Sequence, residues 1–235
     1  MHTVDLKIDP RRLGHGFTLL EMLVVIVIMS ILMTAGAIGL GGMGGKGVTS
    51  GVASTESLFD EARAIAVGQR TKARVMIAKD LTNSPADNLR RIVIASEELD
   101  KDGTPKPNSW ILSSRGVVLP DQVYFSQEYA KKDHKAGSKF DNIMTLPASA
   151  KAAYAGSYFY YEFNAEGICT TPGASFVIGT GARSVNSPTD PPKVTSAAKR
   201  DFGGFVVWRN GRTSVFRSPG QINTEIKSII SGTKF

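Results

Sequence analysis

A long apolar run near the start of the chain, with one acid at its beginning, most constrains what this sequence can form. Glu21 precedes the run MLVVIVIM (residues 22–29), and no further charged residue occurs before Lys46. A helix rises 1.5 Å per residue, so about 20 residues span the hydrocarbon core of a bilayer. An acid costs roughly 2.5–3.5 kcal/mol at the bilayer centre and less near its edge. We therefore expect residues 17–35 to form a transmembrane and assembly helix in which Glu21 has a specific use.

The residues around this run predict how the chain is oriented. Lys7, Arg11 and Arg12 lie in the short polar segment 1–16, which the positive-inside rule keeps in the cytoplasm. The rest of the chain then crosses the membrane once, and its head lies on the far side. A secretory signal peptide is cut after its apolar core. Here the cut is expected before the core, after Gly16, so that the apolar helix stays in the mature protein.

The run Gly16-Phe17-Thr18-Leu19-Leu20-Glu21 and the apolar segment after it resemble the class III signal of type IV pilins and type II secretion pseudopilins. The resemblance implies cleavage between Gly16 and Phe17 by a prepilin peptidase and N-methylation of the new amino terminus at Phe17. It also implies assembly with other pilins or pseudopilins, through a segment that includes Thr18 and Glu21. The alternative is a plain membrane anchor that carries a stray Glu.

The spacing of Phe17 and Glu21 indicates what the carboxylate does. Residues four apart lie on one face of a helix, and the cleaved chain has a mostly protonated amine at Phe17. In a low-dielectric setting an unpaired carboxylate becomes protonated or pairs with a cation. Glu21 can pair with its own terminal amine or with that of a neighbouring subunit. The family resemblance favours the neighbour, which would set the register of subunits in a filament.

The composition fits one globular domain plus a membrane helix. The 235 residues are 42% apolar and 8% aromatic, which is enough for a core and argues against overall disorder. The net charge is +7. Cys169 is the single cysteine, so no intrachain disulfide can form, although the head is expected in an oxidising compartment. We expect Cys169 to be a small, half-buried residue at a strand end and not a reactive thiol.

Four segments are predicted along the chain: a prepilin leader over 1–16, the helix over 17–35, a Gly-rich neck over 36–49 and a periplasmic head over 50–235. The neck is expected because seven glycines fall between Gly36 and Gly47. Each disfavours a helix by roughly 1 kcal/mol relative to alanine. The alternative is close helix–helix packing through glycine faces inside a filament.

The head has the pattern of one amphipathic helix followed by strands. Leu58, Ala62, Ile65 and Ala66 recur at helical spacing and predict a helix from Ser50 to about Gly68. Strands are predicted over 74–78, 89–95, 110–112, 117–119, 123–125, 158–163, 175–178, 205–208 and 213–216, the first two paired and the last two joined by a tight turn at Asn210-Gly211. This order predicts an α+β, pilin-like fold with an antiparallel sheet packed on the helix.

The head also resembles a subfamily. The run Leu58-Phe59-Asp60-Glu61-Ala62-Arg63-Ala64-Ile65-Ala66 followed by Arg74-Val75-Met76-Ile77 is similar to the GspH/FimT-type minor pseudopilins. Leu119-Pro120-Asp121-Gln122-Val123 and Phe163-Asn164-Ala165-Glu166-Gly167 are similar to the later turns of that group. The resemblance implies a non-enzymatic, structural subunit of a type II secretion-like machine that contacts other pseudopilins or secretion cargo. A major pilin or another minor type remains the alternative.

No catalytic, metal or cofactor site is predicted. His2 and His15 belong to the leader, and His134 is expected to be a solvated loop residue among lysines. The stretch Asp100-Lys101-Asp102-Gly103-Thr104 has a faint calcium-loop pattern, but the later acidic ligand is missing at the required spacing. An ordinary turn is expected there.

Basic residues gather toward the C-terminal end and offer an alternative function. They include Lys199, Arg200, Arg209, Arg212 and Arg217. Some FimT-like minor pilins contact DNA during uptake through basic C-terminal residues, so the resemblance allows a type IV minor pilin that captures DNA. A positive face attracts phosphate with strong salt dependence. Solubilising charge that blunts sheet edges is the favoured interpretation, because no interleaving of aromatic and basic residues indicates a nucleic-acid platform.

Two polar stretches fit no regular element. Residues 126–152 are rich in lysine, and residues 181–200 contain Pro188, Pro191 and Pro192. Both are predicted to be long surface loops. As a hypothesis, they distinguish this subunit from its relatives.

Overall fold

A computed structural model describes residues 18–41, 43–134, 137–184, 186–193, 201–216 and 219–222, and over 31–46 it describes the backbone alone. The chain divides into two compact units, one ending at Gly42 and the other beginning at Met43. Each is considered by itself. The predicted leader, residues 1–16, lies outside the described residues.

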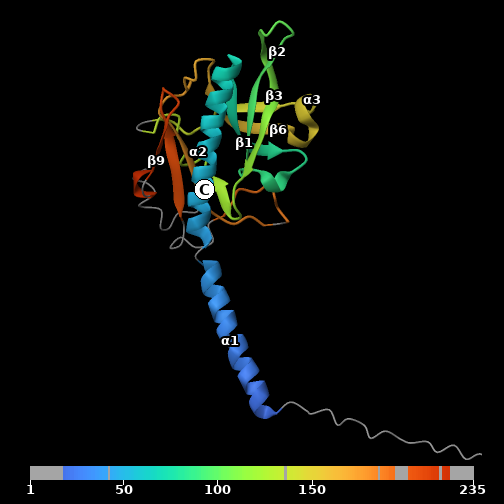
Figure 1. The fold of residues 1–235 in the computed structure, drawn as a ribbon, viewed down its shortest axis with the longest axis vertical. Coiled ribbons are helices and arrows are strands. Elements are labelled where there is room, and N and C mark those ends of the chain that lie inside the picture. Colours follow the sequence, from blue (N-terminus) through green and yellow to red (C-terminus); the bar gives the residue numbers. More distant parts are fainter. Residues whose placement is uncertain are drawn as a thin grey trace, which may run out of the picture. The chain divides into compact units, whose positions relative to one another are not determined.

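The first unit contains the helix α1 (Leu19–Gly41), and the second begins with the helix α2 (Met43–Gln69) (Figure 1). Within the predicted Gly-rich neck, residues 36–49, the described backbone over 36–41 and 43–49 is helical, although each glycine disfavours a helix. In α2 the reason is tertiary packing. Val48 is 2% exposed and belongs to the core, and such burial outweighs the unfavourable propensity of nearby glycines.

The predicted apolar face of α2 is confirmed. Leu58, Ala62 and Ala66 are buried, and Ile65 packs against the core at its edge. The helix begins earlier than predicted and ends at Gln69, close to the expected end. Arg70, in the turn that follows, has a positive φ of 53°.

The strands form two antiparallel sheets. One has the order β3-β2-β1-β6-β5 and the other the order β4-β7-β8-β9. Their bounds are β1 (Ala73–Leu81), β2 (Arg91–Leu99), β3 (Pro105–Val118), β4 (Val123–Phe125), β5 (Ile143–Leu146), β6 (Gly156–Phe163), β7 (Ala174–Thr180), β8 (Phe202–Val207) and β9 (Thr213–Val215). The α+β class is confirmed, but the single sheet that was expected is divided into two.

The strand registers confirm the two predicted pairings. β1 pairs with β2, with Val75 opposite Ile94, and β8 pairs with β9, with Val207 opposite Thr213 across the Asn210-Gly211 turn. The segments 110–112 and 117–119 were predicted as separate strands, but residues 110–112 and 117–118 belong to the single strand β3, which ends before Leu119. Register shifts between β2 and β3 interrupt the regular alternation that would have identified one strand.

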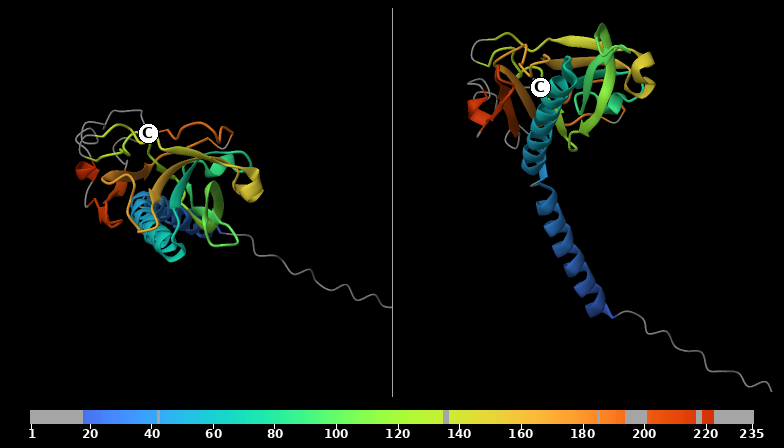
Figure 2. Two further views of the ribbon diagram at one scale, coloured as in Figure 1. Left: turned by 90° about the horizontal axis from the view of Figure 1, so that it is seen from above. Right: turned by 45° about the horizontal axis from the view of Figure 1, so that its top comes forward.

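The main core lies where α2 packs against both sheets (Figures 1 and 2). Phe59 of α2 is fully buried, and its ring centroid lies 5.0–6.2 Å from those of Tyr161, Phe163, Phe176 and Phe205. These partners come from β6, β7 and β8, so one helical side chain joins the two sheets.

A second apolar cluster covers the other face of the five-stranded sheet. It includes Met76, Trp110, Leu146 and Tyr158. Part of its cover comes from 126–152, which we predicted to be a loop without regular structure. That prediction is wrong, because the stretch contains β5 and the short helix α3 (Ala148–Lys151). Burial of Leu146, 1% exposed, anchors an otherwise polar segment on the sheet.

The other predicted loop, residues 181–200, is described over 181–184 and 186–193. A bridge joins Ala182 to Lys193 there, and these residues form no helix or longer strand. Residues 185 and 194–200 lie outside the described residues. The remaining short elements are the 3-10 turns η1 (Pro85–Asp87), η2 (Ala152–Tyr154) and η4 (Pro219–Gln221).

Candidate functional site

The first turn of α1 is capped by Thr18. The amide N–H of Glu21 donates to Thr18 Oγ1 at 3.2 Å, and the amide of Met22 donates to the Thr18 carbonyl oxygen at 3.1 Å. A Thr followed three residues later by Glu is the sequence of a capping box. Thr18 therefore has a local role at the helix start, which the sequence analysis missed although the T-x-x-E spacing was visible.

Glu21 lies in this first turn, and its side chain is exposed. The positive end of the helix dipole stabilises a carboxylate at this position by about 0.3–1 kcal/mol. Gly16 and Phe17 lie outside the described residues. The cleavage site and the pairing of Glu21 with a terminal amine therefore remain predictions.

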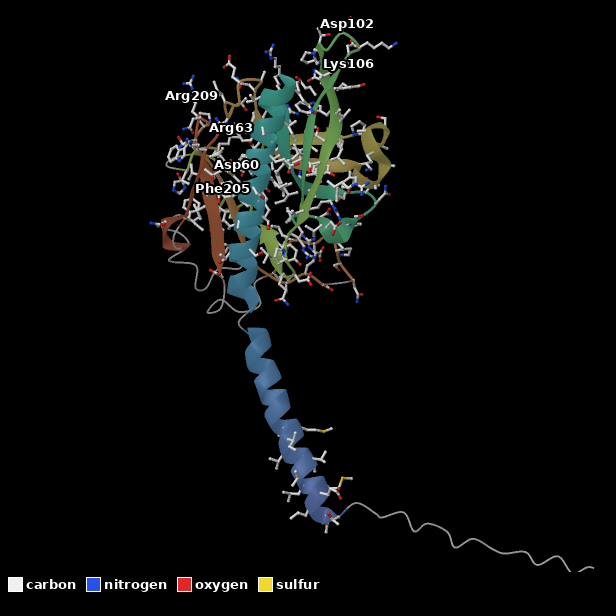
Figure 3. The ribbon with its side chains drawn as sticks, in the orientation of Figure 1. Asp60, Arg63, Asp102, Lys106, Phe205 and Arg209 are labelled. Carbon is white, nitrogen blue, oxygen red and sulfur yellow. The ribbon has the colours of Figure 1, made fainter. Side chains whose placement is uncertain are left out.

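Over residues 22–29 the surface of α1 is apolar on every side. All side chains over residues 22–29 are exposed, from 40% at Val25 to 64% at Ile26 (Figure 3). A helix that is apolar all round is typical of an element buried among other helices or in a membrane. Within the described part of the chain, no helix is both long and apolar enough to cross a membrane.

Two of the predicted basic residues lie on one turn of the head. Arg209 and Arg212 are exposed between β8 and β9. The turn is held by hydrogen bonds from the Trp208 amide to the Arg212 carbonyl and from the Gly211 amide to the Trp208 carbonyl, both 2.9 Å long. Lys199, Arg200 and Arg217 lie outside the described residues, so the structure brings together only part of the predicted basic group.

Trp208 adds an aromatic ring to this turn. It is 43% exposed, and its indole N–H donates to Ser214 Oγ at 2.7 Å. The sequence analysis found no interleaving of aromatic and basic residues, but the Trp208-Arg209 pair is such an arrangement. Arg209 lies on the side of α2 that carries Arg63 (Figure 3), and Arg63 Nε donates to the Gly167 carbonyl at 3.3 Å.

A hollow of about 260 Å³ adjoins this turn and is lined by Asp133, His134, Pro172, Gly173, Trp208 and Arg209. His134 is half-buried, with its ring 4.9 Å from that of Phe216, so the prediction of a fully solvated loop residue is wrong. Burial lowers the pKa of the His134 imidazole, and the charge of Asp133 partly opposes this shift.

The remaining candidate residues have structural environments. Cys169 is 1% exposed, more buried than expected, and burial raises the pKa of its thiol. Asp100 and Gly103 close the β2–β3 turn through a backbone hydrogen bond of 2.9 Å, and the Asp100 carboxylate lies 3.3 Å from Lys106 Nζ. Among the described residues, no group of three or more acidic, His or Cys side chains is placed to hold a metal.

Comparison with known proteins identifies the N-terminal signal. Residues 11–37 match the family described as the prokaryotic N-terminal methylation motif. This match confirms the resemblance of the run from Gly16 to Glu21 to the signal of type IV pilins and pseudopilins. No curated protein matches the chain.

Three solved structures are similar to the chain at low sequence identity. The type IV minor pilin FimU of Pseudomonas aeruginosa is 14% identical over 73% of this chain and 93% of its own, with a TM-score of 0.34. A second crystal form of FimU is 16% identical over 74% and 99%, with a TM-score of 0.33. The minor pseudopilin EpsH of the Vibrio cholerae type 2 secretion system is 12% identical over 74% and 97%, with a TM-score of 0.41.

Proposed function

We propose that the chain is a minor pseudopilin of a type II secretion-like system, of the GspH/FimT type. It is a structural, non-enzymatic subunit that a prepilin peptidase cuts after Gly16 and that is N-methylated at Phe17. The methylation motif over residues 11–37, which includes the exposed apolar side chains over 22–29 of α1, carries this proposal.

In this proposal residues 17–35 hold the subunit in the inner membrane before assembly and pack among the helices of other pseudopilins afterwards. The exposed apolar side chains over 22–29 contact lipid before assembly and neighbouring helices after it. The head then faces the periplasm, where it meets other pseudopilins or secretion cargo.

Glu21 sets the register of the filament. Its carboxylate is the single charge in an apolar surface, so packing against neighbouring helices removes water from it. A buried carboxylate must be paired or protonated. The methylated amine of Phe17 on a neighbouring subunit provides the cation, and only one axial offset between subunits brings the two groups together.

Substitution of Glu21 tests this role. Glu21→Ala should leave cleavage after Gly16 intact, because the change lies beyond the cut, but should strongly reduce incorporation into filaments. Cleavage is read from the mass of the membrane-extracted protein and incorporation from the sheared filament fraction. Glu61→Ala, which removes an exposed carboxylate from α2, is the matched control. Normal assembly of Glu21→Ala would contradict the proposal and favour a plain membrane anchor.

A second candidate function is supported by the β8–β9 turn. An exposed tryptophan between strands, beside Arg209 and close to Arg212, can stack on a base while the arginines contact phosphate. The alternative is accordingly a type IV minor pilin, similar to FimT-like proteins, that binds DNA for uptake.

Binding of a single-stranded oligonucleotide to the full-length protein in detergent decides between the two. If the alternative holds, replacing Arg209 and Arg212 by Gln should weaken binding and reduce the salt slope by about 0.7 for each lost phosphate contact. A double Gln variant at Arg70 and Lys101, both exposed and outside the β8–β9 turn, controls for net charge. Failure of the unmodified protein to bind at low ionic strength would remove the DNA alternative.

A further inference from the structure

A pocket of about 290 Å³ lies at the opposite end of the four-stranded sheet from Arg209. Arg209 follows Val207, which pairs with Ala174 at the first residue of β7, whereas Arg183 follows Thr180 at the last residue of β7. The pocket is lined by Lys79, Asn88, Leu89, Phe125, Gln127, Lys139, Phe159, Arg183, Thr189, Pro191 and Pro192.

The charges in this lining are all positive. Three side chains, Lys79, Lys139 and Arg183, are cationic, and none of the lining residues is acidic. Lys139 Nζ is paired outside the lining with the Glu128 carboxylate at 2.7 Å. Lys79 is exposed, with its Nζ 5.8 Å from the centre of the Phe159 ring. Two cations that face one hollow without an acid between them favour an anionic occupant.

Arg183 holds its charge in a partly buried position. Its guanidinium donates to the Asn88 carbonyl at 2.9 Å and lies 5.0 Å from the centre of the Tyr124 ring. Its Nε is buried and has no hydrogen-bond partner among the described residues. Burial and the neighbouring Arg90 lower the pKa of Arg183, and Asp190 opposes them. Such an unsatisfied donor is uncommon in a folded protein. A bound anion would stabilise the charged guanidinium of Arg183.

The size and walls of the pocket indicate what kind of anion fits. Its volume is at the lower end for ligand sites, which suits one side chain better than a cofactor. Phe125 and Phe159 are 0% and 1% exposed, so neither ring is free to stack on a nucleobase. Pro191 and Pro192 give one wall an apolar character. The cations also lie at the far end of the sheet from Arg209, so the two groups do not form one basic stripe along which a nucleic-acid backbone would run.

We propose that this pocket binds the carboxylate of an Asp or Glu side chain of a partner protein, with Lys79 and Arg183 as its cationic contacts. Thr189 supplies a neutral donor at the same hollow, and the prolines contact an apolar residue beside the acid. The proposal concerns the head alone and does not depend on assembly through Glu21. Disproof of assembly through Glu21 would therefore not disprove binding at this pocket, and the reverse also holds.

A peptide titration tests the chemistry directly. The probe is the blocked tetrapeptide acetyl-Pro-Glu-Phe-Gly-amide, added to full-length ¹⁵N-labelled protein in detergent micelles and followed by NMR. Saturable shifts are expected for the amides of Lys79, Asn88 and Arg183. The same peptide with Gln in place of Glu should have an affinity lower by a factor of about ten or more, because it lacks the charge-assisted hydrogen bonds. Equal binding of the two peptides, or no saturable shift with either, would overturn the proposal.

Variants locate the site. Lys79→Gln and Arg183→Gln should each reduce peptide binding, and Arg183→Lys, which keeps the charge, should retain part of it. Lys101→Gln removes an exposed lysine from the distant β2–β3 turn and should change nothing. An equal loss in Lys101→Gln would show general electrostatic attraction. Binding of inorganic phosphate or of an oligonucleotide at these residues without binding of the Glu peptide would contradict the carboxylate assignment.

Discussion

At the scale of single residues, Phe59 shows how one side chain can organise the head. Its ring contacts Tyr161 of one sheet and Phe176 and Phe205 of the other in edge-to-face geometry. The next residue of α2, Asp60, is exposed. The apolar stripe predicted for this helix did not include Phe59, because the stripe was read from the smaller residues at helical spacing.

Two glycines with nearly the same backbone conformation provide a matched pair of substitutions. Gly211 and Gly103 have φ values of +76° and +77°. A Cβ at Gly211 would lie 2.7 Å from the Gly167 carbonyl oxygen, whereas a Cβ at Gly103 meets no described atom within 4 Å. Gly103→Ala should lower the free energy of unfolding by about 1–2 kcal/mol from the backbone conformation alone.

Gly211→Ala should cost more than Gly103→Ala, since the backbone around Gly167 must also move. Denaturant unfolding of the full-length variants in detergent measures both changes. Equal losses in the two variants would show that the packing of the β8–β9 turn on the 164–167 turn and Arg63 contributes nothing to stability.

At the scale of elements, the sequence predicted those parts whose signal is local. The apolar spacing of α2, the paired strands β1 and β2 and the Asn210-Gly211 hairpin all follow from short-range patterns, and the structure confirms them. The division into two sheets, the strand β5 and the short helix α3 were missed. These depend on contacts far apart in sequence, such as burial of Leu146 against the outer face of the sheet.

The candidate functional residues also divide into those with a local signal in the sequence and those without one. The methylation motif is a contiguous run and was recognised from its residues, whereas the cationic pocket joins Lys79 to Arg183 across a hundred residues of chain. The turn with Trp208 and Arg209 could be predicted in part. The two residues are adjacent in the sequence, but their exposure depends on the fold. In the Gly-rich stretch, intrinsic propensity alone does not predict the helical backbone over 43–49, which the burial of Val48 stabilises.

The cap on α1 gives a prediction for an element. Thr18→Ala should destabilise the first turn by about 0.5–2 kcal/mol, because the Glu21 amide loses the acceptor 3.2 Å away. Thr18→Ser, which keeps the hydroxyl, should behave like the unmodified chain. Hydrogen exchange of the Glu21 amide in detergent micelles reports the change. Unaltered protection in Thr18→Ala would mean that the hydroxyl does not cap the helix in solution.

At the scale of the whole molecule, the described residues of the head are held together without a disulfide. Cys169 is unpaired, and the two apolar clusters lie on the two faces of the five-stranded sheet. Burial keeps several groups in these clusters neutral to a higher pH than in an exposed position. Burial raises the pKa of the Tyr161 and Tyr158 hydroxyls and of the Cys169 thiol, and Tyr161 donates to the Ser175 carbonyl at 2.8 Å.

These shifts predict that the head loses stability in alkali. The pKa values are raised in the folded state, so the stability that the neutral groups contribute is fully present below the unfolded pKa values. These values are 9.0 for the thiol and 10.0 for the phenols. Above them the unfolded chain releases protons that the folded chain retains, and the free energy of unfolding falls as pH rises.

Denaturant unfolding between pH 7 and pH 11 measures this dependence. Tyr161→Phe should be less stable at pH 7, because it lacks the hydrogen bond to Ser175, but its stability should fall less steeply above pH 10. An equally steep fall in the variant, or a flat profile for the unmodified protein, would show that the buried hydroxyl does not control the alkaline limit.

The central claim concerns the whole molecule: the chain is processed as a prepilin and retains its apolar helix. Intact-mass measurement and N-terminal sequencing of the membrane-extracted protein test this claim most directly. We expect a mature chain that begins at Phe17 and is heavier by one methyl group than the unmodified sequence. A chain that begins at Met1, or one cut after the apolar run, would contradict the pilin pathway and leave residues 17–35 as a plain anchor or a discarded signal.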